Sequence, residues 1–333
     1  MATLGATVLT LTDWAKRLDP EGKVPVIAEL LSMTNEILSD MLWKEGNLPT
    51  GERVTVRTGL PTVAWRLLNQ GVAPSKSTTA QIDEQCGMLE AWSEVDKDLA
   101  ALNGNTAEFR LSEAYSFIEA MNQEMAQTLF YGNSGTAPEE FTGLATRYSS
   151  LTATNGQNVI SGSGSGSDNS SVWLIVWGAN SVYGIFPKGS KAGLTHEDLG
   201  LVTVEVTAGI AGNRMRAYQD HWQWKAGIAL KDWRYAVRIC NIDISNLVAK
   251  SSAADLIELM IKAIHRIPQL AMGRPVFYMN RSCLQMLDIQ RRDDMISGGG
   301  LTWDTVDGKR QASFRGIPIR TVDALIETEA TVS

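Results

Sequence analysis

The chain has 333 residues, of which 44% are hydrophobic and 20% are charged, and this is ample for a sizeable core or for two subdomains. The net charge of −7 and the pI near 5.2 argue against tight nucleic-acid binding, which needs concentrated lysine and arginine, but not against loose enclosure of a nucleic acid. Residues 1–20 lack a signal-peptide pattern, and no stretch reaches the ~18 apolar residues of a membrane span, so we expect a soluble intracellular protein.

The first predicted element is an arm, residues 1–48, which begins polar and continues as an apolar segment. A helix is expected after Pro25, with its apolar positions at Ile27, Leu30, Leu31, Ile37, Leu38 and Met41. Nothing in the arm closes a domain of its own. We therefore expect the arm to dock on other protein, such as a neighbouring chain.

Residues 49–95 predict a long β-hairpin. An extended segment follows Pro49, the alternating sequence TVAWRLL follows Pro61, and Asn69–Ala80 is a polar tract rich in turn residues. An alternating strand then returns from Ile82 to Val95. An isolated two-stranded hairpin is marginal in water, so one this long should lie against other protein. The sequence thus gives a hint of contact between subunits.

The segment Asn105–Gly132 predicts one long amphipathic helix. Asn105 can cap its first turn, Glu108 stands at the acidic position of a capping box, and Gly132 with Asn133 supplies a left-handed end. The apolar stripe recurs in steps of four and three, at Ala107, Leu111, Ala114, Ile118, Met121, Met125 and Leu129.

The remainder alternates strands with shorter helices. Strands are expected at VWLIVW from Val172, at SVYGIF, over Leu201–Val206, at Pro275–Met279, and in the final FRGIPIRTVDAL, where Pro318 should break the strand. Met215–Cys240 reads as two long strands joined near Ala226-Gly227. One helix follows a capping box at Ser252–Asp255 and stops at Pro268, and another follows Asn280. Without sustained βαβ alternation the class is α+β.

No motif for catalysis, a metal or a cofactor emerges. The three histidines, His196, His221 and His265, show no zinc spacing, and the three separated cysteines, Cys86, Cys240 and Cys283, suit packing in a reduced compartment. The segment Gly184–Lys191 only approximates a P-loop, and the Gly/Ser tract Ser161–Ser171 is a flexible surface loop without a GxGxxG register. We expect no enzyme activity, no catalytic residue, no metal and no cofactor.

Taken together, several segments resemble the major capsid proteins of tailed bacteriophages, which have the HK97-like fold. They are NEIL (Asn35–Leu38), GLPTVAWRLLNQGV (Gly59–Val72), FIEAMNQEMAQTLFYGN (Phe117–Asn133), VFYMNRSCLQML (Val276–Leu287) and FRGIPIRTVDAL (Phe314–Leu325). No single motif is strong, but the ordered set is specific and covers most of the chain from residue 25.

The resemblance implies four parts. They are an N-terminal arm (1–48), an extended E-loop (49–80), a peripheral domain with the long spine helix (81–135, 212–245 and 310–333) and an axial domain (136–211 and 246–309). One departure stands out, because a stretch similar to the family's late basic-aromatic strand, Trp222–Cys240, precedes the helix at Ser252. We hypothesise a reordered connectivity that places Met215–Cys240 in the peripheral sheet.

The resemblance also implies a function, namely self-assembly into hexamers and pentamers of an icosahedral virion shell that encloses double-stranded DNA. The implied partners are further copies, a scaffolding protein, a portal protein, a cement or decoration protein, and weakly contacted DNA, with assembly in the cytoplasm of the bacterial host and no membrane. The candidates for contact between subunits are Arg57, Trp65, Arg66, Lys76, Asp83 and Glu84. A solvated strand face is the alternative for the charged ones, and Lys76 also raises covalent cross-linking.

Two other functions stay open at the level of sequence. An encapsulin-type nanocompartment would use the same fold around a cargo enzyme. A carbohydrate-active enzyme would use the ten tryptophans as sugar platforms beside carboxylates, although packing against a sheet or between subunits is the simpler use of tryptophan.

Overall fold

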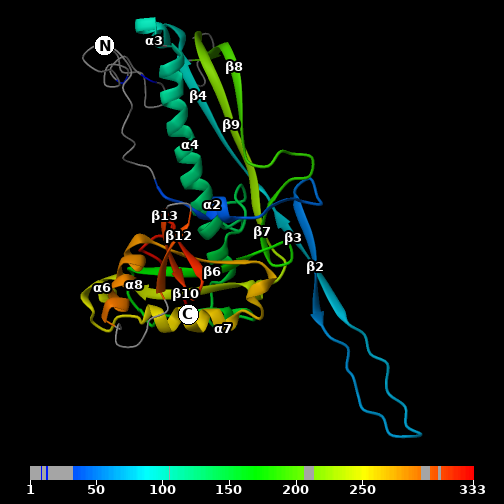
Figure 1. Ribbon diagram of the computed structural model, residues 1–333. Coiled ribbons are helices and arrows are strands. Elements are labelled where there is room, and N and C mark those ends of the chain that lie inside the picture. The colour runs from blue at the N-terminus through cyan, green and yellow to red at the C-terminus, as the bar shows by residue number, and fades with distance from the viewer. Residues whose placement is uncertain are drawn as a thin grey trace. The chain divides into compact units, whose positions relative to one another are not determined.

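The computed structural model describes residues 9, 13, 33–104, 106–205, 214–293, 301–306 and 309–333. Contacts divide the chain into two units (Figure 1). Unit 1 comprises Met1–Met33, Met88–Met125 and Gly193–Lys225, and unit 2 comprises Thr34–Gly87, Ala126–Ala192 and Ala226–Ser333. The predicted helix of the arm before Met33 and the predicted cap Asn105 lie outside the described residues.

Unit 1 is a small sheet with a long helix. The sheet contains β4 (Gly87–Asp96), β8 (Leu194–Glu205) and the first part of β9 (Arg214–Leu230), with β9 bonded to both others. The register of β8 with β9 runs antiparallel from Leu194↔Trp224 to Glu205↔Arg214. Two short helical turns, α3 (Lys97–Ala101) and η1 (Leu102–Gly104), connect β4 to α4 (Thr106–Tyr131), which passes into unit 2 after Met125. The long helix is confirmed.

Unit 2 is built on a larger sheet around β6 (Asn169–Trp177), every residue of which is buried. β6 pairs antiparallel with β10 (Ala236–Asp243) on one side and with β11 (Arg274–Met279) on the other. β5 (Val159–Ser161) continues the sheet beyond β10. Beyond β11 come β14 (Ile317–Thr321), β13 (Lys309–Phe314) and β12 (Leu301–Val306). β7 (Val182–Phe186) pairs with β1 (Trp43–Glu45) and with the end of β9.

The helices of unit 2 begin where the sequence supplies a cap. α7 (Leu256–Arg266) starts at Asp255, whose carboxylate accepts from the Glu258 amide, and α8 (Arg281–Asp293) starts at Asn280, whose Oδ1 accepts from the Cys283 amide at 2.8 Å. α7 packs on β10 and β5, α8 packs beside α7, and α6 (Ile244–Ala249) packs on α8 and β10 (Figure 1). Both predicted helices are confirmed, with Asp255 rather than Ser252 as the cap. The remaining helical segments are α2 (Ile37–Asp40), α5 (Leu144–Arg147), η2 (Gly156–Asn158), η3 (Trp233–Tyr235) and η4 (Leu270–Met272).

Two expected strand breaks are wrong. β9 continues through Ala226-Gly227 because its pairing with β7 begins at Gly227, and the chain turns only at Lys231–Tyr235. Pro318 lies inside β14, and the break comes earlier, where Arg315 and Gly316 take φ of 51° and 79° in a two-residue turn.

Two further local expectations need correction. The strand expected over Ile82–Val95 is interrupted at Cys86, between β3 (Thr78–Gln85) and β4, because the Cys86 amide donates to the Thr50 carbonyl at 3.0 Å. At the end of α4 neither Gly132 nor Asn133 is left-handed. Gly132 is needed for close approach instead, since a Cβ there would lie 2.4 Å from the Phe141 carbonyl oxygen.

The apolar stripe of α4 is buried only over its second half. Met121, Met125 and Leu129 are buried, whereas Leu111 is 55% exposed and Ile118 is also exposed. In the first half the buried residue is Phe109, which packs with Val95 and Ala100. Periodicity thus located the helix but not the part of it that enters the core.

A buried ion pair fixes the segment 322–333 to the large sheet. The Arg238 guanidinium on β10 donates from Nη2 to Glu329 at 2.8 Å and from Nη1 to the Tyr148 carbonyl at 2.9 Å, and it lies over the Trp173 ring. Glu329 also accepts from the hydroxyls of Ser171 and Tyr131. Both charged side chains are at most 5% exposed, so protein groups replace the water that each has lost.

The three cysteines are free thiols, of which Cys240 and Cys283 are buried and Cys86 is half-buried, and we expect all three to be inert. Burial raises the pKa of Cys86 to about 12, with a smaller contribution from Glu52, and raises the pKa of Cys283 to about 12 and of Cys240 to about 11. At pH 8 the thiolate fraction of each should therefore be roughly a hundredfold or more below that of a free cysteine. Mass spectrometry after brief iodoacetamide treatment should find an unmodified native subunit and three modified cysteines in denaturant; rapid native labelling of Cys86 would contradict this.

The boundaries of the four expected parts differ from those of the two units that the contacts define. β8, which spans residues 194–205, pairs with β9 inside unit 1, whereas β13 and β14 belong to the sheet of unit 2. The span Met215–Cys240 is itself shared, since β9 up to Lys225 lies in unit 1 and β10 lies in unit 2. The naming of the parts as peripheral and axial stays a prediction.

Candidate functional site

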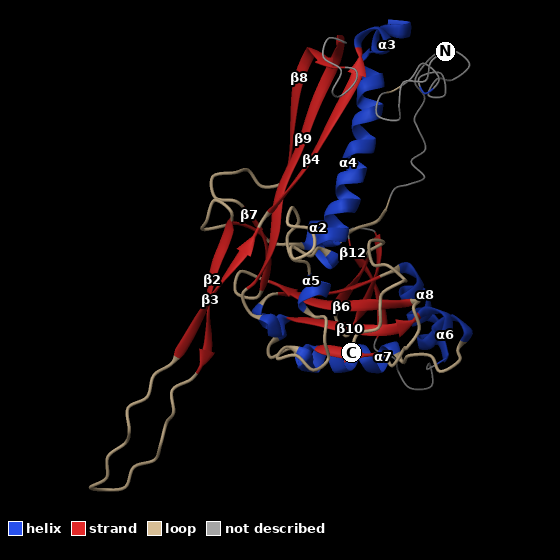
Figure 2. Ribbon diagram, turned by 180° about the vertical axis from the view of Figure 1, so that it is seen from behind, coloured by secondary structure: helices blue, strands red, loops and turns tan. Residues whose placement is uncertain are grey.

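A hairpin with an unusually long loop is the feature of unit 2 that its own core does not explain. β2 (Gly51–Gly59) pairs antiparallel with β3 from Gly51↔Gln85 to Gly59↔Thr78. Residues 60–77 have no regular structure and continue as a narrow loop beyond the ends of both strands (Figure 2). The predicted hairpin is confirmed, but the segment TVAWRLL lies in the loop rather than in a strand, and β3 already begins at Thr78 inside the tract expected to be the turn. We call residues 60–77 the tip.

The tip exposes large apolar side chains without cover. Trp65 is fully exposed, and so to a large extent are Leu60, Val63, Leu67, Leu68 and Val72. Few bonds hold the loop: the Ser75 hydroxyl donates to the Thr62 carbonyl at 2.7 Å, and the Gln70 amide donates to the Leu67 carbonyl at 3.2 Å. Contiguous exposed apolar side chains of this size mark a surface that binds other protein. The tip also carries Arg66 and Lys76 and no carboxylate.

The base of the hairpin is fixed to the body by a bidentate ion pair. Glu84 on β3 is only 6% exposed, and its two oxygens accept from Nη1 and Nη2 of Arg147, both at 2.6 Å. The Arg147 guanidinium also donates to the Thr142 carbonyl at 3.1 Å. The fork geometry holds one strand of the hairpin in a fixed direction.

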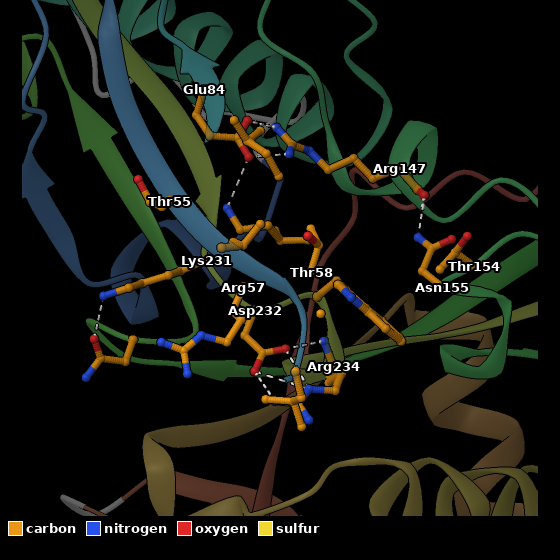
Figure 3. Close-up of a pocket in the computed structure, with 17 residues that line it drawn as sticks. Thr55, Arg57, Thr58, Glu84, Arg147, Thr154, Asn155, Lys231, Asp232 and Arg234 are labelled. Carbon is orange, nitrogen blue, oxygen red and sulfur yellow. Dashed lines mark hydrogen bonds and ion pairs between the residues drawn. The ribbon is translucent and has the colours of Figure 1, made fainter. Parts of the chain in front are cut away.

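Next to this ion pair lies a pocket of about 1050 Å³ (Figure 3). β2 forms one wall and residues 230–234 form another. Asp232 is paired with Arg234, and the Lys231 ammonium donates to the Asn180 side chain at 2.7 Å. Arg57 also lines the pocket, and its cation adds to that of Lys231, so the free charge here is positive.

The six sequence candidates occupy three environments. Trp65, Arg66 and Lys76 lie in the exposed tip, and Arg57 lies in the pocket. Asp83 is exposed and accepts from Arg53 at 2.6 and 2.7 Å, and this hydrogen-bonded pairing holds the pKa of Asp83 below its usual value. Glu84 is bound within the chain by Arg147, so we keep only the other five as candidates for direct contact between copies.

Sequence reasoning missed Arg147, because its partner is 63 residues away and no local pattern joins them. It also passed over the exposed leucines of the tip, Leu67 and Leu68, although the alternating run TVAWRLL lies in a polar surrounding that offers no local core. That mismatch was the available signal.

Replacing Arg147 by methionine should loosen the base of the hairpin. The Glu84 carboxylate would then keep only the weak 3.4 Å contact from the Leu230 amide, which should lower the free energy of unfolding by about 1–3 kcal/mol. Urea unfolding of the unassembled subunit would measure the loss. Lys262→Met, which removes an exposed partner of Glu258 on α7, is the matched control and should change stability little.

Two of the three histidines, His196 and His221, pack against aromatic rings in unit 1, whereas His265 is exposed on α7 of unit 2. His196 stacks on Trp222 and lies 2.9 Å from Asp220, and His221 stacks on Trp92. Among the described residues no group of three or more His, Cys, Asp or Glu is arranged to hold a metal ion. Likewise, none of the described helices is long and apolar enough to cross a membrane.

The exposed apolar side chains of the tip are suited to contact with other protein. The comparison with known families identifies the family of the chain. The family model described as "Major capsid protein GP7" matches residues 19–333. The chain belongs to this family. It is thus a phage major capsid protein and a virion component, and its family is one of structural proteins.

A solved structure that covers the whole chain gives the same assignment. The chain is similar to a chain of the bacteriophage epsilon15 structure, with 32% identity, a TM-score of 0.79, and coverage of 100% of this chain and 99% of that one. A chain of the bacteriophage JBD30 capsid matches at 8% identity, a TM-score of 0.46, and coverage of 90% and 91%. The encapsulin SrpI of Synechococcus elongatus matches at 11% identity, a TM-score of 0.43, and coverage of 70% and 96%. No curated protein matches the chain. The expected α+β class and HK97-like fold are confirmed.

Proposed function

We propose that copies of this chain form hexamers and pentamers that close an icosahedral shell around the double-stranded DNA of a phage. The exposed tip is the observation that supports this proposal, because its apolar side chains have no cover in the subunit and would gain cover on a neighbour. The contacts are heterologous, since the tip of one copy meets a different surface of the next, and closure depends on curvature.

The area buried per subunit should exceed the roughly 2,000 Å² of an ordinary stable interface. Trp65 is the main apolar anchor, and Arg57, Arg66, Lys76 and Asp83 supply charged contacts between copies. Glu84 acts indirectly, because its bond to Arg147 directs the hairpin.

The proposal extends to partners. A separate scaffolding protein guides assembly in the cytoplasm of the bacterial host, a portal protein occupies one vertex, and a cement protein adds to the outer surface. The net charge of −7 supports weak, non-specific contact with the packaged DNA, since it leaves no excess of cations to bind phosphates tightly.

Electron microscopy and sedimentation of the purified chain, with and without the scaffolding protein of its phage, test the proposal. We expect capsomers without scaffold and closed shells with it. A compact monomer under both conditions, with the amides of residues 60–77 protected from hydrogen exchange, would refute it.

A further inference from the structure

The Gly/Ser loop of unit 2, residues 162–168, connects β5 to β6 and is held against the junction of β10 with α6. The Gly164 amide donates to the Asn241 carbonyl at 2.8 Å, and the Ser245 amide donates to the Asp168 carboxylate at 3.2 Å. Asp168 and Ser245 are 77 residues apart in the chain. The fold thus places a loop of small residues beside a second polar segment, residues 241–246.

Asn169 is wholly buried at the end of this loop, and its side-chain carbonyl has no hydrogen-bond donor within the described part of the chain. Its Nδ2 group donates to the carbonyl oxygen of Gly166 at 2.6 Å and to that of Glu329 at 3.4 Å. Both backbone carbonyls can only accept, so the amide cannot be turned over to satisfy Oδ1. A buried carbonyl oxygen of this kind calls for a donor or a cation.

Gly164 lies where three buried polar groups meet. A Cβ added to this glycine would lie 2.7 Å from Asn169 Oδ1, 2.7 Å from the Asn241 carbonyl oxygen and 2.9 Å from the Cβ of Asp243. None of these three neighbours is more than 9% exposed. The carbonyl oxygen of Asn169 therefore shares its surroundings with a second carbonyl oxygen and with an acid.

Two carboxylates border the same loop. A Cβ added to Gly166 would lie 2.5 Å from Asp168 Oδ1 and 3.2 Å from Asp243 Oδ2. Among the residues that the structure describes, the partners of both carboxylates are amides and a hydroxyl of Ser245 and Asn246, and neither carboxylate pairs with lysine or arginine. Capping of α6 explains the bond of Asp243 to the Asn246 amide, but it does not balance two negative charges beside two carbonyl oxygens.

We propose that this loop binds one calcium ion, whose protein ligands are the carboxylates of Asp168 and Asp243 and the carbonyl oxygens of Asn169 and Asn241. Oxygen ligands of these types suit calcium, magnesium and manganese. Calcium accepts six to eight oxygens at irregular angles, whereas magnesium demands a near-ideal octahedron, so a loop of glycine and serine favours calcium. The site has only two carboxylates, far apart in the sequence, and this is why the sequence led us to expect no metal.

A calcium ion at this site would join three segments of unit 2. It would link the loop to the start of α6 and, through Asn169, to the end of the chain, because Asn169 Nδ2 also lies 3.3 Å from Thr331 Oγ1 and the Glu329 amide donates to the Asn169 carbonyl at 2.9 Å. Calcium should therefore stabilise the subunit against heat. With two carboxylates the dissociation constant should be on the order of 10⁻⁴–10⁻³ M.

Isothermal titration of the purified subunit with calcium chloride, after removal of divalent cations by a chelator, tests the proposal. We expect one saturable site per chain, and Asp168→Asn should weaken it at least roughly tenfold. Asp168 is partly exposed, so this substitution should leave the fold intact, as circular dichroism would show. Glu139→Gln, which removes an exposed carboxylate of the same unit, is the matched control and should bind calcium normally.

Gly166→Ala separates a built site from general attraction to an acidic surface. The added Cβ would meet the movable carboxylates of Asp168 and Asp243, so it should displace ligands without changing the charge of the chain. We expect calcium binding to weaken here too. In thermal unfolding, calcium at about 10 mM should raise the Tm of the normal chain by about 2–4 °C more than magnesium does, and this difference should disappear in both variants.

The inference is independent of the proposed function, because the titration uses one subunit and does not require a shell. A normal chain without a saturable calcium site would overturn the proposal. So would equal affinities of the normal chain, Asp168→Asn and Gly166→Ala, or an equal loss in Glu139→Gln, which would show that calcium only associates with surface charge.

Discussion

Replacing Glu329 by glutamine should lower the free energy of unfolding by about 3–5 kcal/mol, because it leaves the buried Arg238 guanidinium without a counter-ion. The neutral amide would also present an NH₂ group toward donors that the carboxylate now accepts, among them the hydroxyls of Ser171 and Tyr131. Chemical unfolding of the unassembled subunit, followed by tryptophan fluorescence, would measure the loss.

Glu258→Gln is the matched control for this substitution. Its carboxylate pairs with Lys262 in solvent on α7, so the change should cost at most about 0.5 kcal/mol. If Glu329→Gln were as harmless as this control, the segment 322–333 would contribute little to the stability of the sheet, against our interpretation.

Replacing the tip by a tight turn should abolish shell formation without unfolding the subunit. Joining Gly59 to Thr78 through Asn-Gly keeps the register of β2 with β3, since these two residues are partners at the end of the ladder. The subunit loses only exposed side chains, so its unfolding midpoint should stay the same or rise slightly.

Sedimentation and electron microscopy of the shortened chain would show the effect on assembly. We expect no closed particles, because truncating a central aromatic anchor alone can cost about 2–4 kcal/mol per contact and every subunit repeats the contact. A second variant keeps the original length of the tip but changes the apolar residues of 60–77 to serine and threonine. It shows whether assembly needs the apolar side chains or only the length of the loop. Normal shells from either variant would show that the tip does not hold copies together.

Local signals predicted the elements of this fold well. Asn280 was expected to cap the helix that follows it and does so, and Asp255, the last residue of the expected capping box, caps α7 in place of Ser252. The polar tract between two alternating segments likewise predicted the hairpin. In each case the information lies within a few residues of the element that it specifies.

What the sequence could not supply is pairing at a distance. Arg238 and Glu329 are 91 residues apart, and nothing near either residue indicates the other. The apolar stripe of α4 also did not indicate which of its residues are buried. Leu111 and Leu129 both belong to the stripe, but only Leu129 is buried. For the site, sequence picked out Trp65 and Arg66, but the bond that withdraws Glu84 from the surface required coordinates.

The position of β14 in the sheet bears on when the subunit can fold during synthesis. β14 pairs with β11, Val322 bridges to Asn35, and the Val332 amide bonds to Asn241 at 2.8 Å. The residues translated last among these are therefore required to complete a sheet whose other strands were made long before. A nascent chain still lacking residues 317–333 would leave the edge of β11 unpaired and the core unfinished, so the subunit can complete its fold only after translation has passed this point.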